Sequence, residues 1–214
     1  MAKVKVLGGT GFAGSNIVRV AVNRGHEVTS YSRNLPAEAV PGATYVTGSV
    51  FEADFLAEVV ADADVVVETL SPRGELEGKL EGVVAELSTL AQNAGVRLGV
   101  VGGAGSLLVA PGGPKLMDTD GFPAEFLPEA ITGEALLEAL RVSPAGLDWF
   151  YLSPAAAFGA WVPGEATGTF RIGGDVLLVD GDGNSNISGA DLAAALVDEI
   201  ESPAHGRRRF TVAY

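Results

Sequence analysis

Short apolar runs rich in β-branched residues alternate with amphipathic stretches along the first 150 residues of the chain. Such runs are typical of strands, and the stretches between them have the period of a helix. The predicted strands are Lys3–Leu7, Glu27–Tyr31, Thr44–Thr47, Asp64–Glu68, Arg97–Gly102 and Leu147–Leu152. The predicted helices are Ala13–Arg24, Glu52–Ala61, Leu76–Ala94, Glu129–Val142 and, after Ser188 as its N-cap, Gly189–Glu201.

The order of these elements predicts an α/β protein. Strands as uniformly apolar as "DVVVE" and "RLGVV" indicate a sheet with both faces covered by helices. Repeated strand–helix–strand units join parallel strands by right-handed crossovers, which gives a doubly wound parallel sheet.

Three segments depart from this alternation. Residues 103–128 are rich in glycine and proline, and a connection of this length is usually functional, as a lid or binding loop. Residues 168–186 predict a hairpin that turns near Gly173 and Gly174. The basic run Arg207–Arg209 before "FTVAY" predicts the exposed start of a strand.

The strongest motif is the turn after the first predicted strand. Gly8, Gly11 and Gly14 form G-x-x-G-x-x-G between a strand and an amphipathic helix, and a further strand follows at Glu27. Glycine allows positive φ and lets a diphosphate approach the backbone amides at the start of the helix. This complete βαβ unit predicts a dinucleotide site, in which Thr10 and Phe12 share the turn with the glycines.

The end of the second strand indicates which dinucleotide is bound. NAD-selective sites place a carboxylate there to accept from the ribose 2′-hydroxyl, whereas this chain has Ser32 and Arg33. A guanidinium and a hydroxyl would instead donate to a 2′-phosphate. We therefore predict NADP(H) as the cofactor, with NAD(H) as the second option.

The composition limits the classes of partner that the chain can bind. The formal net charge of -13 argues against a nucleic-acid partner, and the absence of cysteine excludes thiol catalysis and Cys-ligated metals. No apolar run could cross a membrane, and "MAK" leads directly into a strand, so we expect no signal peptide, no metal and a cytoplasmic protein. A monomer or a homodimer is expected.

The quoted segments "GGTGFAGS", "SRN", "VGGAGSL" and "TFRIGGDVLLVDGDGNSNISGADLAAALVDEIE" resemble the atypical short-chain dehydrogenase/reductases, in particular their NADH-flavin reductase-like group. The resemblance covers nearly the whole chain. It implies one NAD(P)-binding Rossmann domain over residues 1–214, with a small substrate-capping portion that we assign to residues 103–128 and 154–187.

The carboxyl ends of the strands supply the expected site, because ligands bind there in an open α/β sheet. Beyond the residues named above, the expected cofactor contacts are Ser49, Val50, Thr69, Leu70, Ser71, Gly102 and Gly103. The resemblance implies an Asp at the position of Ser49, so that the serine is a departure. Candidates for the apolar substrate pocket are Leu107, Phe122, Phe126, Pro154 and Phe158, with Leu108 and Trp161 also available.

The chain has no Tyr-x-x-x-Lys pair of the kind with which the larger superfamily polarises a carbonyl. Ser106 is the one candidate catalytic hydroxyl, and a loop-capping role is equally open to it. We therefore expect an NAD(P)H-dependent reductase that passes hydride to a flavin (FMN or FAD), a quinone or another small conjugated acceptor. The alternative is an NADP(H)-binding regulatory or redox-sensing protein without turnover.

Overall fold

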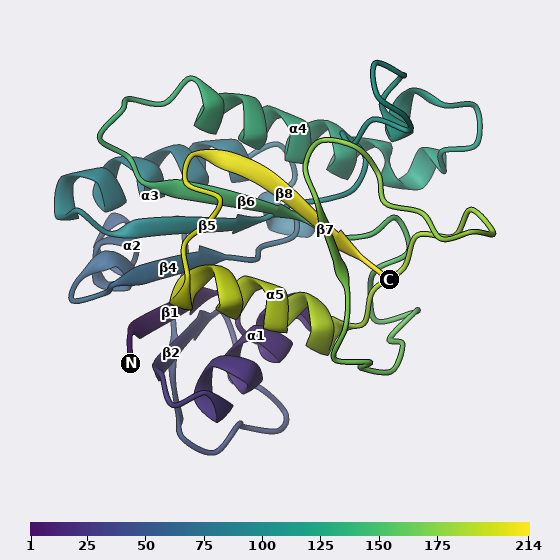
Figure 1. Cartoon of the computed structure of the whole chain (residues 1–214). Helices are drawn as coiled ribbons and strands as arrows, with labels where there is room; N and C mark the ends of the chain where they lie inside the picture. Colours follow the sequence, from purple (N-terminus) through teal and green to yellow (C-terminus); the bar gives the residue numbers. More distant parts are fainter.

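A computed structural model describes residues 1–214 and shows an eight-stranded sheet between two layers of helices (Figure 1). The strand order is β3-β2-β1-β4-β5-β6-β8-β7. All neighbours pair in parallel except β7, which is antiparallel to β8. The strands are β1 (Lys3–Leu7), β2 (Glu27–Ser32), β3 (Ala43–Thr47), β4 (Val65–Glu68), β5 (Arg97–Val101), β6 (Trp149–Ser153), β7 (Arg171–Gly173) and β8 (Arg208–Ala213).

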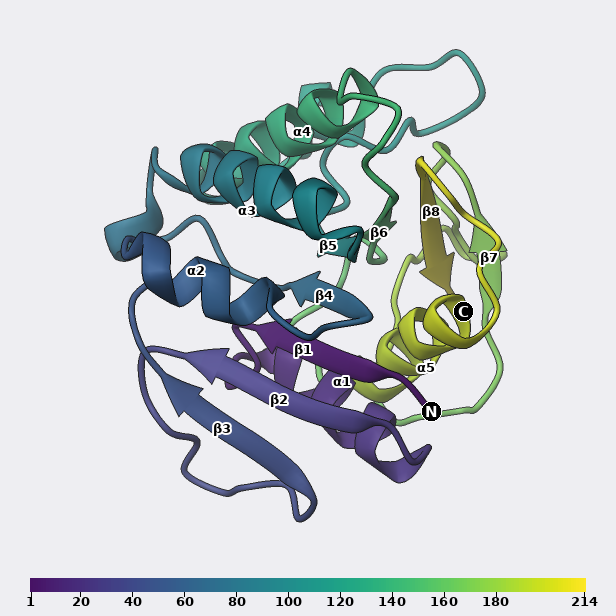
Figure 2. The same cartoon turned by 90° about the vertical axis from the view of Figure 1, so that its left-hand side faces the viewer.

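The helices cover both faces of the sheet, as Figure 2 shows. Helices α2 (Ala53–Val60), α3 (Leu80–Ala94) and α4 (Leu127–Arg141) lie on one face, and α1 (Phe12–Asn23) and α5 (Gly189–Glu201) lie on the other. Each face has its own apolar core, built around residues such as Leu87 and Leu137 on the first and Ile17 and Leu196 on the second. No helix is long and apolar enough to span a membrane.

The predicted doubly wound Rossmann fold is confirmed, and the predicted elements agree with the observed ones to within a few residues for most boundaries. The largest difference in a helix is the start of α3, because residues 74–76 form a separate 3-10 helix, η1 (Gly74–Leu76). Two further 3-10 helices, η2 (Leu116–Asp118) and η3 (Ala124–Phe126), interrupt the long connection before α4.

The hairpin predicted for residues 168–186 is wrong. The first half forms β7, but β7 pairs with β8 at the edge of the sheet. The second half pairs elsewhere: Leu108 N–H donates to the Asp175 carbonyl at 2.8 Å, and Leu177 N–H donates to the Leu108 carbonyl at 2.8 Å. Alternation of apolar residues identifies a strand but not its partner, and here both halves found partners far away in the sequence.

The expectation that Arg207–Arg209 is an exposed strand start holds only for Arg208. Arg209 is buried, and its guanidinium donates to Ser106 Oγ and Asp175 Oδ1, both at 2.8 Å. Arg207 donates to backbone carbonyls of the loop that precedes β6. Two of the three charges are therefore structural, because each has carbonyl or side-chain acceptors that replace water.

Both long segments predicted as a cap lie at the carboxyl edge of the sheet, the side on which β8 points in Figure 1. The Leu108–Asp175 backbone bonds join them to each other, and Arg209 joins both to β8. These contacts hold the two segments together beside the ends of β5 and β6.

A carboxyl group is buried at the end of β4. Glu68 has no exposed surface; its Oε1 accepts from Leu70 N–H at 2.6 Å, and its Oε2 has no partner. Burial raises the pKa of Glu68 from its ordinary value of 4.5 to about 8, because an ionised carboxylate would lose its hydration there. The neutral acid is thus the favoured form at neutral pH.

This carboxyl should make stability pH-dependent. Between about pH 4.5 and 8 the folded chain keeps a proton on Glu68 that the unfolded chain releases, so stability should fall as the pH rises through this window. The full effect is on the order of 5 kcal/mol. In urea titrations, Glu68→Gln should flatten this slope, whereas the exposed Glu81→Gln should keep it. A slope that survives in Glu68→Gln would contradict the assignment.

Candidate functional site

A cleft of about 670 Å³ runs along the carboxyl edge of the sheet. Its walls come from the residues that follow β1, β2, β3, β4, β5 and β6 and from both long segments. Most residues predicted for the site line it: Gly8, Thr10, Gly11, Phe12, Ser32, Arg33, Ser49, Val50, Thr69, Leu70, Ser71, Gly102, Gly103, Phe122, Phe126, Pro154 and Phe158. The sheet topology therefore brings together residues from six strand ends.

The glycine turn requires glycine at two of its three motif positions. Gly8 has φ of +88°, which disfavours other residues, and an added Cβ would lie 2.8 Å from Thr69 Oγ1. A Cβ on Gly14 would lie only 2.3 Å from the Gly8 carbonyl oxygen. Gly14 lies beneath the cleft lining, so its role is to let α1 pack against the end of β1.

The start of α1 fits an anionic ligand. Gly11 is the N-cap, no side chain accepts from the first turn, and no acidic residue lies in that turn. Backbone N–H groups at an uncapped helix start need acceptors, and the positive end of the helix dipole favours negative charge. Gly11 and Phe12 line the cleft, so the residues present fit a diphosphate.

At the β2 end of the cleft, two predicted hydroxyls have local partners. Ser32 Oγ accepts from Thr10 N–H at 3.3 Å and so braces the glycine turn. Ser49 Oγ accepts from Phe51 N–H at 3.3 Å. The Arg33 side chain is 65% exposed at the rim, where its Nη1 lies 3.1 Å from Glu75 Oε2.

The middle of the cleft is lined by backbone. Thr69 Oγ1 donates to the Leu7 carbonyl at 3.0 Å. A Cβ on Gly102 would overlap the Tyr151 hydroxyl, so only glycine fits there. Tyr151 is fully buried and donates to the Gly133 carbonyl at 2.8 Å, and burial raises the pKa of its phenol. This phenol is engaged below the cleft and does not face a ligand.

The far end of the cleft is aromatic. Phe126 and Trp161 stack with ring centroids 5.8 Å apart and planes at 13°, and Phe158 packs on Phe12 at 5.3 Å. Gly159, at φ of +155°, leaves room for the Trp161 ring, which a Cβ would meet at 2.2 Å. Trp161 nevertheless stays 63% exposed. This end offers flat apolar surfaces next to the ends of β5 and β6.

Ser106 and Leu107 are not part of the cleft lining. Leu107 is fully buried, and Ser106 is buried with its hydroxyl accepting from Arg209. Their placement favours a structural role for both. The sequence could not show this, because the partner of Ser106 lies 103 residues away.

Three charged cleft residues were not predicted. Glu75 faces Arg33, and Arg73 forms an ion pair with Glu129, which also lies 3.3 Å from Ser71 Oγ. They lie in the connection after β4 and in the first turn of α4. No spacing in the sequence distinguishes them from other polar loop residues. The one available signal was that Arg73 and Glu75 follow the end of a predicted strand.

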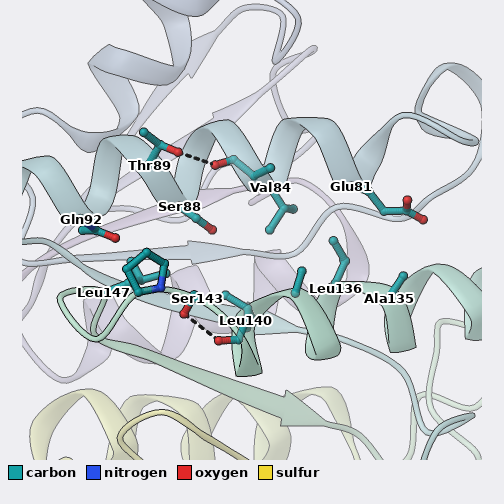
Figure 3. A pocket seen from close by; sticks show the side chains of 13 residues that line it. Glu81, Val84, Ser88, Thr89, Gln92, Ala135, Leu136, Leu140, Ser143 and Leu147 are labelled. Carbon is teal, nitrogen blue, oxygen red and sulfur yellow. Dashed lines mark hydrogen bonds between the residues drawn. The ribbon is translucent and has the colours of Figure 1, made fainter.

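A second hollow, of about 450 Å³, lies between α3 and α4 (Figure 3). Small and apolar side chains from the two helices face it, and Glu81 is its only charged residue. The Thr89 hydroxyl donates to a carbonyl of its own helix, and the Ser143 hydroxyl, just beyond α4, donates to the Leu140 carbonyl. This hollow is separate from the strand ends and offers no cluster of groups for a phosphate.

Comparison with known proteins agrees with this geometry. A family model described as NAD(P)H-binding matches residues 8–203. The uncharacterised protein YwnB of Bacillus subtilis is 38% identical over 212 residues, which cover 98% of this chain and 97% of YwnB.

Two solved structures are also similar. A protein of Burkholderia pseudomallei, called a "putative exported protein", is 40% identical with a TM-score of 0.88 over the full length of both chains. A Streptococcus pneumoniae protein, called a "putative NADH-flavin reductase", is 30% identical with a TM-score of 0.87, covering 100% of this chain and 99% of that one. The matched region contains the glycine turn and the residues that follow every strand whose end lines the cleft. The chain belongs to the NAD(P)H-binding family of Rossmann proteins.

Proposed function

We propose that this protein is an NAD(P)H-dependent oxidoreductase that prefers NADPH and passes hydride to a flavin, a quinone or another small conjugated acceptor. The observation that carries the proposal is the continuity of the cleft. One cavity joins an uncapped helix start and an arginine to stacked aromatic rings. A dinucleotide and a flat acceptor therefore have adjoining places.

Different residues of the cleft would bind different parts of the dinucleotide. The first turn of α1 would hold the diphosphate, Arg33 the 2′-phosphate, and Thr69, Leu70 and Gly102 the nicotinamide half. Bound NADPH would supply the hydride: NADPH, one proton and the oxidised acceptor give NADP⁺ and the reduced acceptor. The chain contributes alignment of two rings and exclusion of water.

The proton donors that line the cleft limit which acceptors can be reduced there. No lysine lines it. Of the tyrosines, Tyr31 lines it at the end of β2, and Tyr151, below Gly102, is buried and already donates to a carbonyl. A ketone needs a proton donor beside its oxygen, whereas a flavin or quinone carries its own redox chemistry and can take its proton from water.

Residues 103–128 and 154–187 act as the substrate-side cap on one Rossmann domain that spans residues 1–214. The protein works in the cytoplasm as a monomer or homodimer, with a small-molecule acceptor as its partner.

The direct test is turnover. Purified protein with NADPH and FMN, riboflavin or a panel of quinones should oxidise the nicotinamide well above the rate without protein, as followed by absorbance. Tight NADPH binding with no oxidation across the panel would contradict the reductase and favour a regulatory protein. Binding of neither nucleotide at millimolar concentration would contradict the cofactor assignment as well.

Arg33→Ala tests the cofactor preference. Loss of a hydrogen bond to a charged group costs roughly 1.5–3 kcal/mol, so the NADPH Kd should rise about ten- to hundred-fold while the NADH Kd hardly changes. Arg19→Ala removes the same charge from an exposed position outside the cleft and is the matched control. Equal losses for both nucleotides in calorimetric titrations would show that Arg33 does not contact the 2′-phosphate.

Trp161→Ala tests the acceptor end. Stacking of aromatic rings contributes roughly 0.5–1.5 kcal/mol, so KM for FMN or a quinone should rise about three- to ten-fold with the NADPH Kd unchanged. Because Trp161 is 63% exposed, the melting temperature should change little. Ile131→Ala, at an exposed apolar position outside the cleft, should leave KM at its original value. An unaltered KM in Trp161→Ala would remove this ring from the acceptor site.

A further inference from the structure

The rim of the cleft holds a carboxylate that the β2 strand does not supply. Arg33 directly follows β2, and Glu75 belongs to η1, in the connection after β4. Both line the cleft, and Arg33 Nη1 lies 3.1 Å from Glu75 Oε2. The fold thus places opposite charges from two separate connections side by side at the end of the cleft.

This is the position from which nucleotide preference is set in such folds. A carboxylate near the end of the second strand accepts from the 2′-hydroxyl of the ribose in NAD(H), and an arginine there binds the 2′-phosphate of NADP(H). The chain has the arginine in its usual connection and a carboxylate that reaches the same place from another one. The Oε1 atom of Glu75 has no protein partner.

We propose that Glu75 is a specificity-determining residue, which accepts from the ribose hydroxyl of NADH and repels the 2′-phosphate of NADPH. The chain then uses both nucleotides, and the balance between Arg33 and Glu75 sets a modest preference. This inference rests on the nucleotide site of the proposed function and adds the residue that limits its selectivity.

The Arg33–Glu75 ion pair is exposed to solvent and is therefore weak enough for a bound nucleotide to compete with it. The side chains are 65% and 68% exposed, and ion pairs in that setting are weak because water and salt screen them. A 2′-phosphate can therefore replace Glu75 as the partner of Arg33. The negatively charged carboxylate of Glu75 then remains close to the negatively charged phosphate and repels it. With NADH the pair can persist while Oε1 receives the hydroxyl.

The other charged residues near the cleft have partners of their own and do not compete with Arg33 and Glu75 for the ribose or its phosphate. Arg73 and Glu129 pair with each other near the start of α4, and Phe51 at the rim is covered by Lys79, whose ammonium lies 5.2 Å from the ring centroid. Glu75 is therefore the carboxylate whose removal should change the charge that a 2′-phosphate meets.

The test compares Glu75→Gln with Glu77→Gln, which removes a carboxylate two residues away that does not line the cleft. NADPH and NADH are titrated into each protein and the Kd values are measured. Glu75→Gln should bind NADPH about three- to ten-fold more tightly and NADH about three- to ten-fold more weakly, because the repulsion is removed and the charge-assisted hydrogen bond to the ribose becomes a weaker neutral one. Glu77→Gln should shift both only slightly and in the same direction as each other.

The outcomes separate this inference from the proposed function. If Glu75→Gln and Glu77→Gln change both Kd values alike, only net charge is acting and the inference is overturned, although the nucleotide site stands. If NADH binding does not weaken in Glu75→Gln, Glu75 does not accept from the ribose. If the unsubstituted protein binds neither nucleotide, the proposed function fails together with the inference. Thermal unfolding of each variant confirms that it is folded.

Discussion

The structure depends on one close approach, that of the first turn of α1 to the end of β1. Gly14 lies so near the Gly8 carbonyl that no side chain can come between them. This contact fixes the start of the helix at the carboxyl edge of the sheet. Because Ser32 also braces the turn through Thr10, the first two strand ends and the helix form one unit. The same packing of α1 against β1 also forms the candidate cofactor site.

The two long segments, residues 103–128 and 154–187, are held in a different way, by buried polar links. Arg209 joins the loop after β5 to Asp175, and Asp191 at the start of α5 accepts from Thr167 N–H, Gly168 N–H and the Tyr214 hydroxyl. Removing one member of such a link would leave a buried charge or donor without a partner, which is costly. The walls of the aromatic end of the cleft are therefore tied to the sheet at two places, although they contain little regular structure.

Sequence alone predicted the parts that depend on local rules. The strand and helix periods, the glycine turn and the position of Arg33 follow from residue types at fixed spacing, and the structure brings these residues into one cleft. The errors concern contacts between distant segments. Nothing near Gly173 shows that β7 pairs with β8, and nothing near Ser106 or Glu75 shows that Arg209 and Arg33 are their partners. Such pairings arise only when the topology is known.

The two tryptophans of the chain have opposite environments. Trp149 is wholly enclosed in the core, and Trp161 lies at the aromatic end of the cleft with most of its surface in water. An indole in each setting emits at a different wavelength, and reduced nicotinamide absorbs where tryptophan emits. The protein therefore has one intrinsic fluorophore beside the cleft, whose contact with water a ligand would change, and a second in the core, which meets water only when the chain unfolds.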